Sequence, residues 1–358
     1  MNKVFFPNLN GVRAFAALSV IVFHHYGVSV INGELGVDLF FVLSGFLISF
    51  LLLTEKENFG GITFGKFYMR RILRIWPLYF LILLLSIIFY ISTSGWNKDL
   101  TNILPYYLLF SPNLVISPLS FAYGRVLWSV GAEEQFYLIW PWVIEKINIK
   151  KILFFLFLTI LVFTFSPHFI DFLNVRYFNN NELLHNISWA IPKTGFAAMA
   201  TGAVVAYFAI YQKEKFNVIF SKIFQYILLL VLGVSWWLNL KIPYIEKEYF
   251  CILFALVIAN AALNDKVVFS LENRVFNYLG KISFGLYVFH LIGLDLSIEL
   301  FKYFNVKIGQ PYHLIFILGV ILTILLSSLS YNFFEKPFLK IKNSKKYTVV
   351  SSTAEKVQ

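Results

Sequence analysis

Long apolar runs, most of them close to 20 residues, recur along this chain of 358 residues. As a helix, a run of about 20 residues crosses the roughly 30 Å hydrocarbon core of a membrane. Only 14% of the residues are charged, well below the roughly 25% typical of soluble domains. These features exclude an ordinary soluble domain and a disordered chain. They predict an all-α integral membrane protein.

The apolar runs predict about ten transmembrane helices. Their ranges are 10–30, 35–54, 72–93, 127–145, 152–167, 190–211, 223–240, 248–264, 277–300 and 312–334. An N-terminus in the cytoplasm places 22 of the 30 Lys and Arg residues inside and 8 outside, so both chain ends are predicted to be cytoplasmic. We expect one transmembrane domain over 1–340 and a basic, flexible cytoplasmic tail over 341–358.

Ionisable side chains in the first two spans are functional candidates, because charge inside a membrane is costly. Arg13 and His24 are eleven residues apart, which is close to three turns and about 16 Å along one helix face. A structural interpretation stays open, with His24 hydrogen-bonded in the core and Arg13 extending to the interface. Asp38 lies about a turn from the outer boundary of the second span, where simple solvation is the alternative.

Three arginines, Arg70, Arg71 and Arg74, stand at the cytoplasmic edge of the third span. Their spacings of three and four residues allow the guanidinium groups to face one way. Arginine offers planar, bidentate donors that suit phosphate. Anchoring at lipid headgroups is the alternative interpretation.

The fourth span carries two adjacent carboxylates, Glu133 and Glu134. Both cannot be ionised and unpaired in an apolar helix, so at least one needs a cationic or histidine partner, or a proton. His24 reaches a similar predicted depth, so we expect it to be able to meet one of these carboxylates. A purely structural ion pair is the alternative.

The ninth span carries a polar stripe formed by Ser283, Tyr287 and His290, which share one helix face. Such stripes also join helices without any chemistry. Motifs for nucleotide hydrolysis and zinc catalysis are missing from the sequence, so we expect no metal site.

Five segments, taken in order, resemble the membrane acyltransferase family called acyltransferase 3. They are LNGVRAFAALSVIVFH, GVDLFFVLSGFLI, RRILRIWP, WSVGAEEQFYLIWP and GKISFGLYVFH, followed by FEKP. The resemblance runs from about Pro7 to Phe338. It implies O-acylation of glycans, lipids or related compounds, with cytoplasmic acyl-coenzyme A, most often acetyl-coenzyme A, as the donor substrate and no tightly bound cofactor. We expect a stand-alone form without a fused extracytoplasmic domain.

The resemblance assigns roles to individual residues. The histidine of the first span falls on His24, the R-x-x-R motif on Arg71 and Arg74, and the glutamate of the fourth span on Glu133. We expect His24 to act as general base or acyl relay, with Glu133 orienting its ring. The supporting candidates are Arg13 for the donor phosphates, and Asp38, Glu134, Ser283, Tyr287 and His290.

Two departures from the family pattern affect secondary contacts. Asn10 stands where the family often has Asp, so no Asp–Arg pair with Arg13 is expected. In the ninth span, Phe284 and Val288–Phe289 replace the family's usual Tyr and Leu-Trp.

The expected partners are acyl-coenzyme A, a hydroxyl acceptor on a glycan or glycolipid, and membrane lipids, with no nucleic acid. We expect a multi-pass protein of the bacterial inner membrane, with acceptor choice residing in the outer stretches 94–126 and 167–189. A transporter or flippase that uses the buried Arg, His and Glu as a proton or anion path is the alternative from another class. A lipid-linked sugar transferase would need acidic metal-binding clusters, and none stands out.

Overall fold

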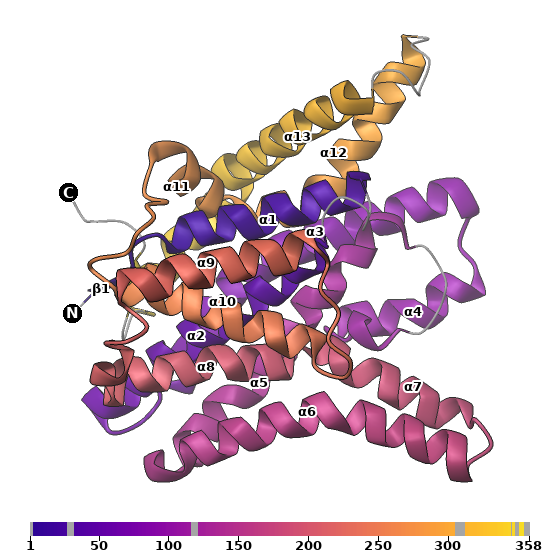
Figure 1. Ribbon diagram of the computed structural model, residues 1–358. Coiled ribbons are helices and arrows are strands. Elements are labelled where there is room, and N and C mark those ends of the chain that lie inside the picture. The colour runs from indigo at the N-terminus through magenta and orange to yellow at the C-terminus, as the bar shows by residue number, and fades with distance from the viewer. Residues whose placement is uncertain are drawn as a thin grey trace.

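The computed structural model describes residues 3–26, 32–115, 121–304, 312–344, 346–347 and 351–353. These residues form a bundle of long helices (Figure 1). The long helices are α1 (Leu9–Tyr26), α2 (Glu34–Phe59), α3 (Phe64–Ser94), α5 (Leu127–Lys146), α6 (Ile149–Tyr177), α8 (Phe196–Tyr211), α9 (Lys222–Trp237), α10 (Glu246–Leu263), α12 (Ser283–Tyr303) and α13 (Tyr312–Leu329).

Shorter elements connect these helices. They are α4 (Lys98–Leu108), α7 (Glu182–Ala190), α11 (Arg274–Lys281), α14 (Lys336–Lys342), the 3₁₀ helices η1 (Pro112–Leu114), η2 (Ala122–Val126), η3 (Ile191–Thr194) and η4 (Lys213–Phe216), and the π-helix η5 (Ser330–Glu335). Two three-residue strands, β1 (Lys3–Phe5) and β2 (Ser351–Thr353), pair in parallel. The first and last described segments therefore lie together, at the end of the bundle where Figure 1 labels β1.

Each of the ten predicted ranges overlaps a helix, which confirms the all-α membrane class. Among the described residues, six helical segments are long and apolar enough to cross a membrane, as judged by length and composition. They are Glu34–Phe59, Phe64–Ser94, Ile149–Tyr177, Glu182–Tyr211, Ser283–Tyr303 and His313–Lys342. The number of crossings and the cytoplasmic location of the ends stay predictions. The predicted domain boundary at 340 falls inside α14, and the flexibility of the tail also stays a prediction.

The predicted ranges 152–167 and 277–300 differ from the helices that the structure shows. The range 152–167 continues as α6 to Tyr177 with Pro167 in its interior, because a continuous helix is how a chain in lipid satisfies its backbone groups. Together with α7, this makes most of the stretch 167–189 helical. The range 277–300 is divided at Ile282 into α11 and α12. Near this break α11 lies close to α1, since a Cβ on Gly280 would clash with the backbone of Asn10.

Helix α2 lies at the centre of the bundle and is the most buried of the six apolar segments. It packs along α8, where a Cβ on Gly45 would clash with the backbone of Met199 and one on Gly202 with that of Val42. Gly36 approaches α1 in the same way, against Ser19. Small residues let helix backbones approach closely in membranes, and Gly36, Gly45 and Gly202 act in this way here.

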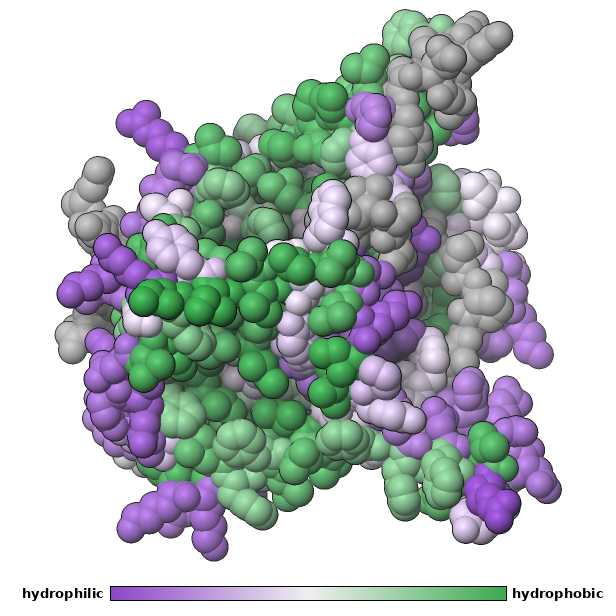
Figure 2. Space-filling view, in the orientation of Figure 1, coloured by the Kyte–Doolittle hydropathy of each residue, from purple (hydrophilic) through white to green (hydrophobic). Residues whose placement is uncertain are grey.

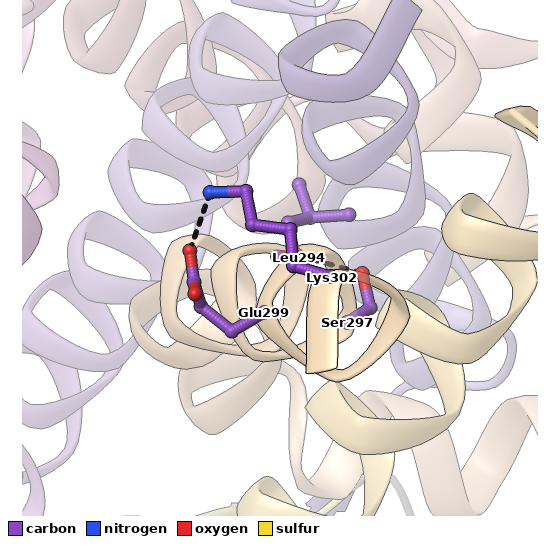
Figure 3. Close-up of polar contacts among 4 residues, drawn as sticks. All are labelled: Leu294, Ser297, Glu299 and Lys302. Atoms are coloured by element: carbon purple, nitrogen blue, oxygen red, sulfur yellow. Dashed lines mark hydrogen bonds and ion pairs between the residues drawn. The ribbon is translucent and has the colours of Figure 1, made fainter. Parts of the chain in front are cut away.

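The surface of the bundle matches a lipid environment. Figure 2 shows a broad hydrophobic band between hydrophilic residues at the two ends. Polar groups near the end of α12 are paired within that helix (Figure 3): Lys302 Nζ lies 2.7 Å from Glu299 Oε1, and Ser297 Oγ donates to the carbonyl of Leu294 at 2.7 Å. These four residues need no partner from elsewhere in the bundle.

Candidate functional site

A cavity of about 280 Å³ opens between α1, α3, α11 and α14, and we call it the cationic cavity. Its charged lining residues are Arg13, Arg70, Arg71, Arg74, Lys281 and Lys342. No Asp or Glu lines it in the part of the chain that the structure describes. Such a lining attracts a ligand that carries several negative charges.

A deeper cavity of about 110 Å³ adjoins the first, and we call it the Glu133 cavity. The two cavities share the side chains of Arg13, Arg71 and Arg74, so these arginines stand at their boundary. The wall of the Glu133 cavity combines apolar residues of α2, such as Phe40, with polar residues of α5 and α12. A ligand with a charged head and a less polar arm fits this sequence of spaces.

The three boundary arginines make no hydrogen bond or ion pair within the described residues. The guanidinium carbon of Arg71 lies 5.9 Å from the ring centre of Phe67 and 5.8 Å from that of Tyr137. Its Nε is buried without a hydrogen-bond partner. Because a buried, unpaired donor on a cation is costly, this arrangement is suited to an anion that supplies the missing acceptors.

Glu133 stands with these arginines rather than with His24. Its Oε1 accepts a hydrogen bond from Ser44 Oγ at 2.7 Å, and its Oε2 accepts one from the Tyr137 hydroxyl at 3.0 Å. Arg74 and Arg71 act on it electrostatically. The predicted meeting of His24 and Glu133 is therefore wrong: equal depth in the membrane does not bring side chains on different helix faces together.

Glu134 points in another direction from its neighbour. Its Oε2 accepts from the indole Nε1 of Trp76 at 2.9 Å, while its Oε1 is buried without a partner. Adjacent residues on a helix are about 100° apart, so the two carboxylates are held by different helices. Glu134 does not line either of the two cavities described so far.

His24 lies near the end of α1 and its partner is His290 of α12, with 4.6 Å between the ring centres. The Nδ1 of His24 is 3.0 Å from the carbonyl oxygen of Val20. A carbonyl can only accept, so Nδ1 carries the proton of this hydrogen bond, and the Nε2 of a neutral ring keeps its lone pair. Nε2 of a neutral His24 ring can therefore accept a proton.

The polar stripe of α12 joins the Glu133 cavity to His24. Ser283 and Tyr287 line the cavity, and the Tyr287 hydroxyl lies 2.7 Å from Ser129 Oγ and donates to the Val126 carbonyl at 3.1 Å. His290 is fully buried, and its Nδ1 lies 2.6 Å from the Tyr287 carbonyl while its Nε2 has no partner. Ser283, Tyr287 and His290 therefore lie along one face of α12, as their spacing predicts.

Asp38 belongs to neither cavity. It lines a third cavity of about 540 Å³, together with residues of α6 and α10, and we call this the Asp38 cavity. The structure therefore brings together Arg13, Arg71, Arg74 and Glu133, places His24 with His290, and leaves Asp38 apart.

Sequence reasoning missed several lining residues. Tyr137 could have been found, because it follows Glu133 by four residues and so lies on the same helix face. Ser44 had only its place within an apolar span as a signal. Lys281 and Lys342 had none, because their approach to the arginines depends on how α11 packs on α1 and how α14 packs on α3.

Comparison with known proteins agrees with this geometry. The family model described as "Acyltransferase domain" matches residues 6–332. The chain belongs to the acyltransferase 3 family. The protein named O-acetyltransferase OatA from Staphylococcus aureus strain NCTC 8325 is 28% identical over 379 residues, covering 94% of this chain and 57% of the relative, and OatA of strain COL gives the same values.

The chain thus spans little more than half the length of these relatives. No solved structure matches it. The residues highlighted in the two adjoining cavities, apart from Lys342, fall inside the matched family domain.

Proposed function

We propose that the protein is a membrane-bound O-acyltransferase, which moves an acyl group from cytoplasmic acyl-coenzyme A to a hydroxyl of a cell-surface glycan or glycolipid. Acetyl is the expected acyl group, and the bacterial cell membrane is the expected location. The cationic cavity, with its arginine boundary to the Glu133 cavity, carries this proposal. Family membership and relatives named O-acetyltransferase support the reaction class.

The two cavities match the two ends of the donor. Coenzyme A carries its phosphates at one end and its thiol at the end of a flexible, less polar arm. Arginine and lysine side chains around the cationic cavity would bind the phosphates. The arm would pass the boundary arginines into the Glu133 cavity and direct the thioester towards His24, which lies about 16 Å along α1 from Arg13.

The chemistry requires one base. As the acceptor oxygen attacks the thioester carbonyl, Nε2 of His24 takes the proton of that hydroxyl. The carbon–sulfur bond then breaks, and the proton passes to the leaving thiolate, giving free coenzyme A and the O-acyl product. In the relay version, Nε2 itself attacks the thioester and expels the thiolate; the acceptor hydroxyl then takes the acyl group from Nε2 and gives its proton to the thiolate. Both versions use the same lone pair.

Glu133 takes a different role from the one that its family position suggests. We assign it to the donor side, where it holds Ser44 and Tyr137 in place and offsets part of the arginine charge. His290 replaces it as the neighbour of the His24 ring.

The test uses purified protein in proteoliposomes with labelled acetyl-coenzyme A and a cell-envelope glycan fraction. Release of the free thiol and transfer of label are followed for the wild type, His24→Ala and His25→Ala. We expect His24→Ala to lower transfer by about 10²- to 10⁴-fold, the usual contribution of a general acid–base group. His25 is the matched control, because its ring packs on Phe316. Full activity in His24→Ala would refute the assignment, and loss of activity in both variants would point to damage of α1.

A further inference from the structure

The Asp38 cavity lies at the start of α2, whereas the cationic cavity borders the middle of that helix. Helix α2 contributes Glu34, Leu35 and Asp38 to the former and Leu47, Ile48 and Leu51 to the latter. At 1.5 Å per residue, the nine residues from Asp38 to Leu47 correspond to about 14 Å along the helix axis, and the two cavities share no lining residue. The two spaces are therefore separate sites on one central helix.

Asp38 is the least expected residue in this cavity. It is only 8% exposed, and it makes no hydrogen bond or ion pair among the described residues. The charge of Lys247 acts on it without forming an ion pair. Because a buried carboxylate without donors is costly, its oxygens, which border a cavity of about 540 Å³, are positioned to accept hydrogen bonds from a ligand.

The rest of the lining mixes donors and acceptors. The charged residues are Glu34, Asp38, Glu246, Glu248, Lys241 and Lys247. Thr164 donates to Glu248 Oε1 at 3.0 Å, and the ring of His168 meets that of Tyr244 edge to face at 5.1 Å. The hydroxyl groups of a sugar both donate and accept hydrogen bonds. The C–H faces of the sugar ring pack on aromatic rings. No described group of three or more His, Cys, Asp or Glu is arranged to hold a metal ion.

The Asp38 cavity also lies beside the helix end that carries His24. The start of α2 packs against the end of α1, where a Cβ on Gly33 would clash with the side chain of Phe23. The charge of Glu34 acts on both His24 and Asp38. In Figure 1 the loop that joins α9 and α10 runs over the front of this end of the bundle, and Figure 2 shows hydrophilic residues gathered beside it.

We propose that the Asp38 cavity binds the sugar part of the acyl acceptor, with Asp38 accepting hydrogen bonds from its hydroxyl groups. This inference rests on the proposed function, because it assigns the second substrate of that reaction. The ligand of the Asp38 cavity is neutral and rich in hydroxyl groups. The lysines among the carboxylates disfavour a polycation, and the four carboxylates disfavour the polyanionic donor.

The experiment measures sugar binding without any donor. Purified full-length protein in detergent is dialysed to equilibrium against labelled neutral tetrasaccharides of glucose, mannose or N-acetylglucosamine, and separately against spermidine. Binding of coenzyme A is measured on the same preparations. The variants are Asp38→Asn, which keeps the side-chain shape, and Tyr244→Ala, which alters a residue that is 66% exposed. Glu182→Gln is the control, because Glu182 is exposed at the start of α7 outside the cavity.

We expect at least one neutral tetrasaccharide to bind. Asp38→Asn should raise its Kd about tenfold or more, since a hydrogen bond to a charged group contributes about 1.5–3 kcal/mol. Tyr244→Ala should weaken binding less, Glu182→Gln should leave it unchanged, and all variants should keep their affinity for coenzyme A.

Absence of sugar binding in the wild type, or equal binding in wild type, Asp38→Asn and Tyr244→Ala, would overturn the inference. Preferential binding of spermidine would overturn it by showing a cation site. Failure of the proposed function has a different signature, because the wild type would then not bind coenzyme A while sugar binding persisted.

Discussion

The cationic cavity and the Asp38 cavity are both bordered by α2, yet they carry opposite electrostatic character. The first gathers six Arg and Lys side chains and no described acid, whereas the second has four carboxylates and two lysines. On the proposed function, this difference would let one bundle separate its two substrates. A polyanionic donor would be attracted to the cationic cavity and disfavoured at the Asp38 cavity, and a neutral acceptor would avoid competition from the donor.

The strongest test of this division changes Arg71 and Arg74 to Gln together. The donor phosphates would lose two charged partners, each worth about 1.5–3 kcal/mol, so the KM for acetyl-coenzyme A should rise by about 100-fold or more. Steady-state kinetics at varied donor concentration measures this change. The Kd for the neutral tetrasaccharide should stay the same, and an equal loss of sugar affinity would break the division between the two cavities.

A substitution of His290 tests the region between the two cavities. Edge and face contacts of rings contribute about 0.5–1.5 kcal/mol, so His290→Ala should lower kcat up to about tenfold by releasing the His24 ring, with both KM values unchanged. His290→Phe keeps a ring without polar atoms and should restore most of the rate. If His290→Phe does not restore kcat and also changes the pH profile of kcat, then His290 takes part in proton transfer and does more than position the His24 ring.

The smallest effect is expected at the mouth of the cationic cavity. Lys342 lies in α14 and lines the cavity, whereas Lys340 on the same helix is exposed and does not. Ion pairs near the surface contribute about 0.2–1 kcal/mol, so Lys342→Ala should raise the donor KM about twofold to fivefold. The effect should shrink at high salt. An equal change in Lys340→Ala would show that general surface charge, and not the cavity, attracts the donor.

The sequence was most informative about features that depend on the spacing of nearby residues along one helix. Apolar runs located the long helices of the described residues, because the thickness of the membrane sets the length of a spanning helix. The arginine cluster was predictable because residues three and four apart share a helix face. The stripe of Ser283, Tyr287 and His290 was predictable on the same grounds.

The sequence was least informative where helices meet. The sequence predicted how deep His24 lies in the membrane but not which helix its side chain faces. The expected partner was therefore Glu133, whereas in the structure the neighbouring ring is that of His290. Near the break at Ile282, Gly280 approaches Asn10, which is far away in the chain. Asp38 could be recognised as a charge within a span, but the cavity around it comes from α6 and α10.

The glycine contacts between α2 and α8 have a consequence for selectivity. With Gly45 and Gly202 seated on the opposing backbones, α2 is locked against lengthwise sliding, since any shift would drive a neighbouring side chain into the facing helix. The central helix then holds its residues at fixed positions, spaced 1.5 Å apart along its axis. Each added methylene would lengthen an acyl chain against these fixed positions. The two glycines would therefore limit the length of the acyl group, although they touch no substrate.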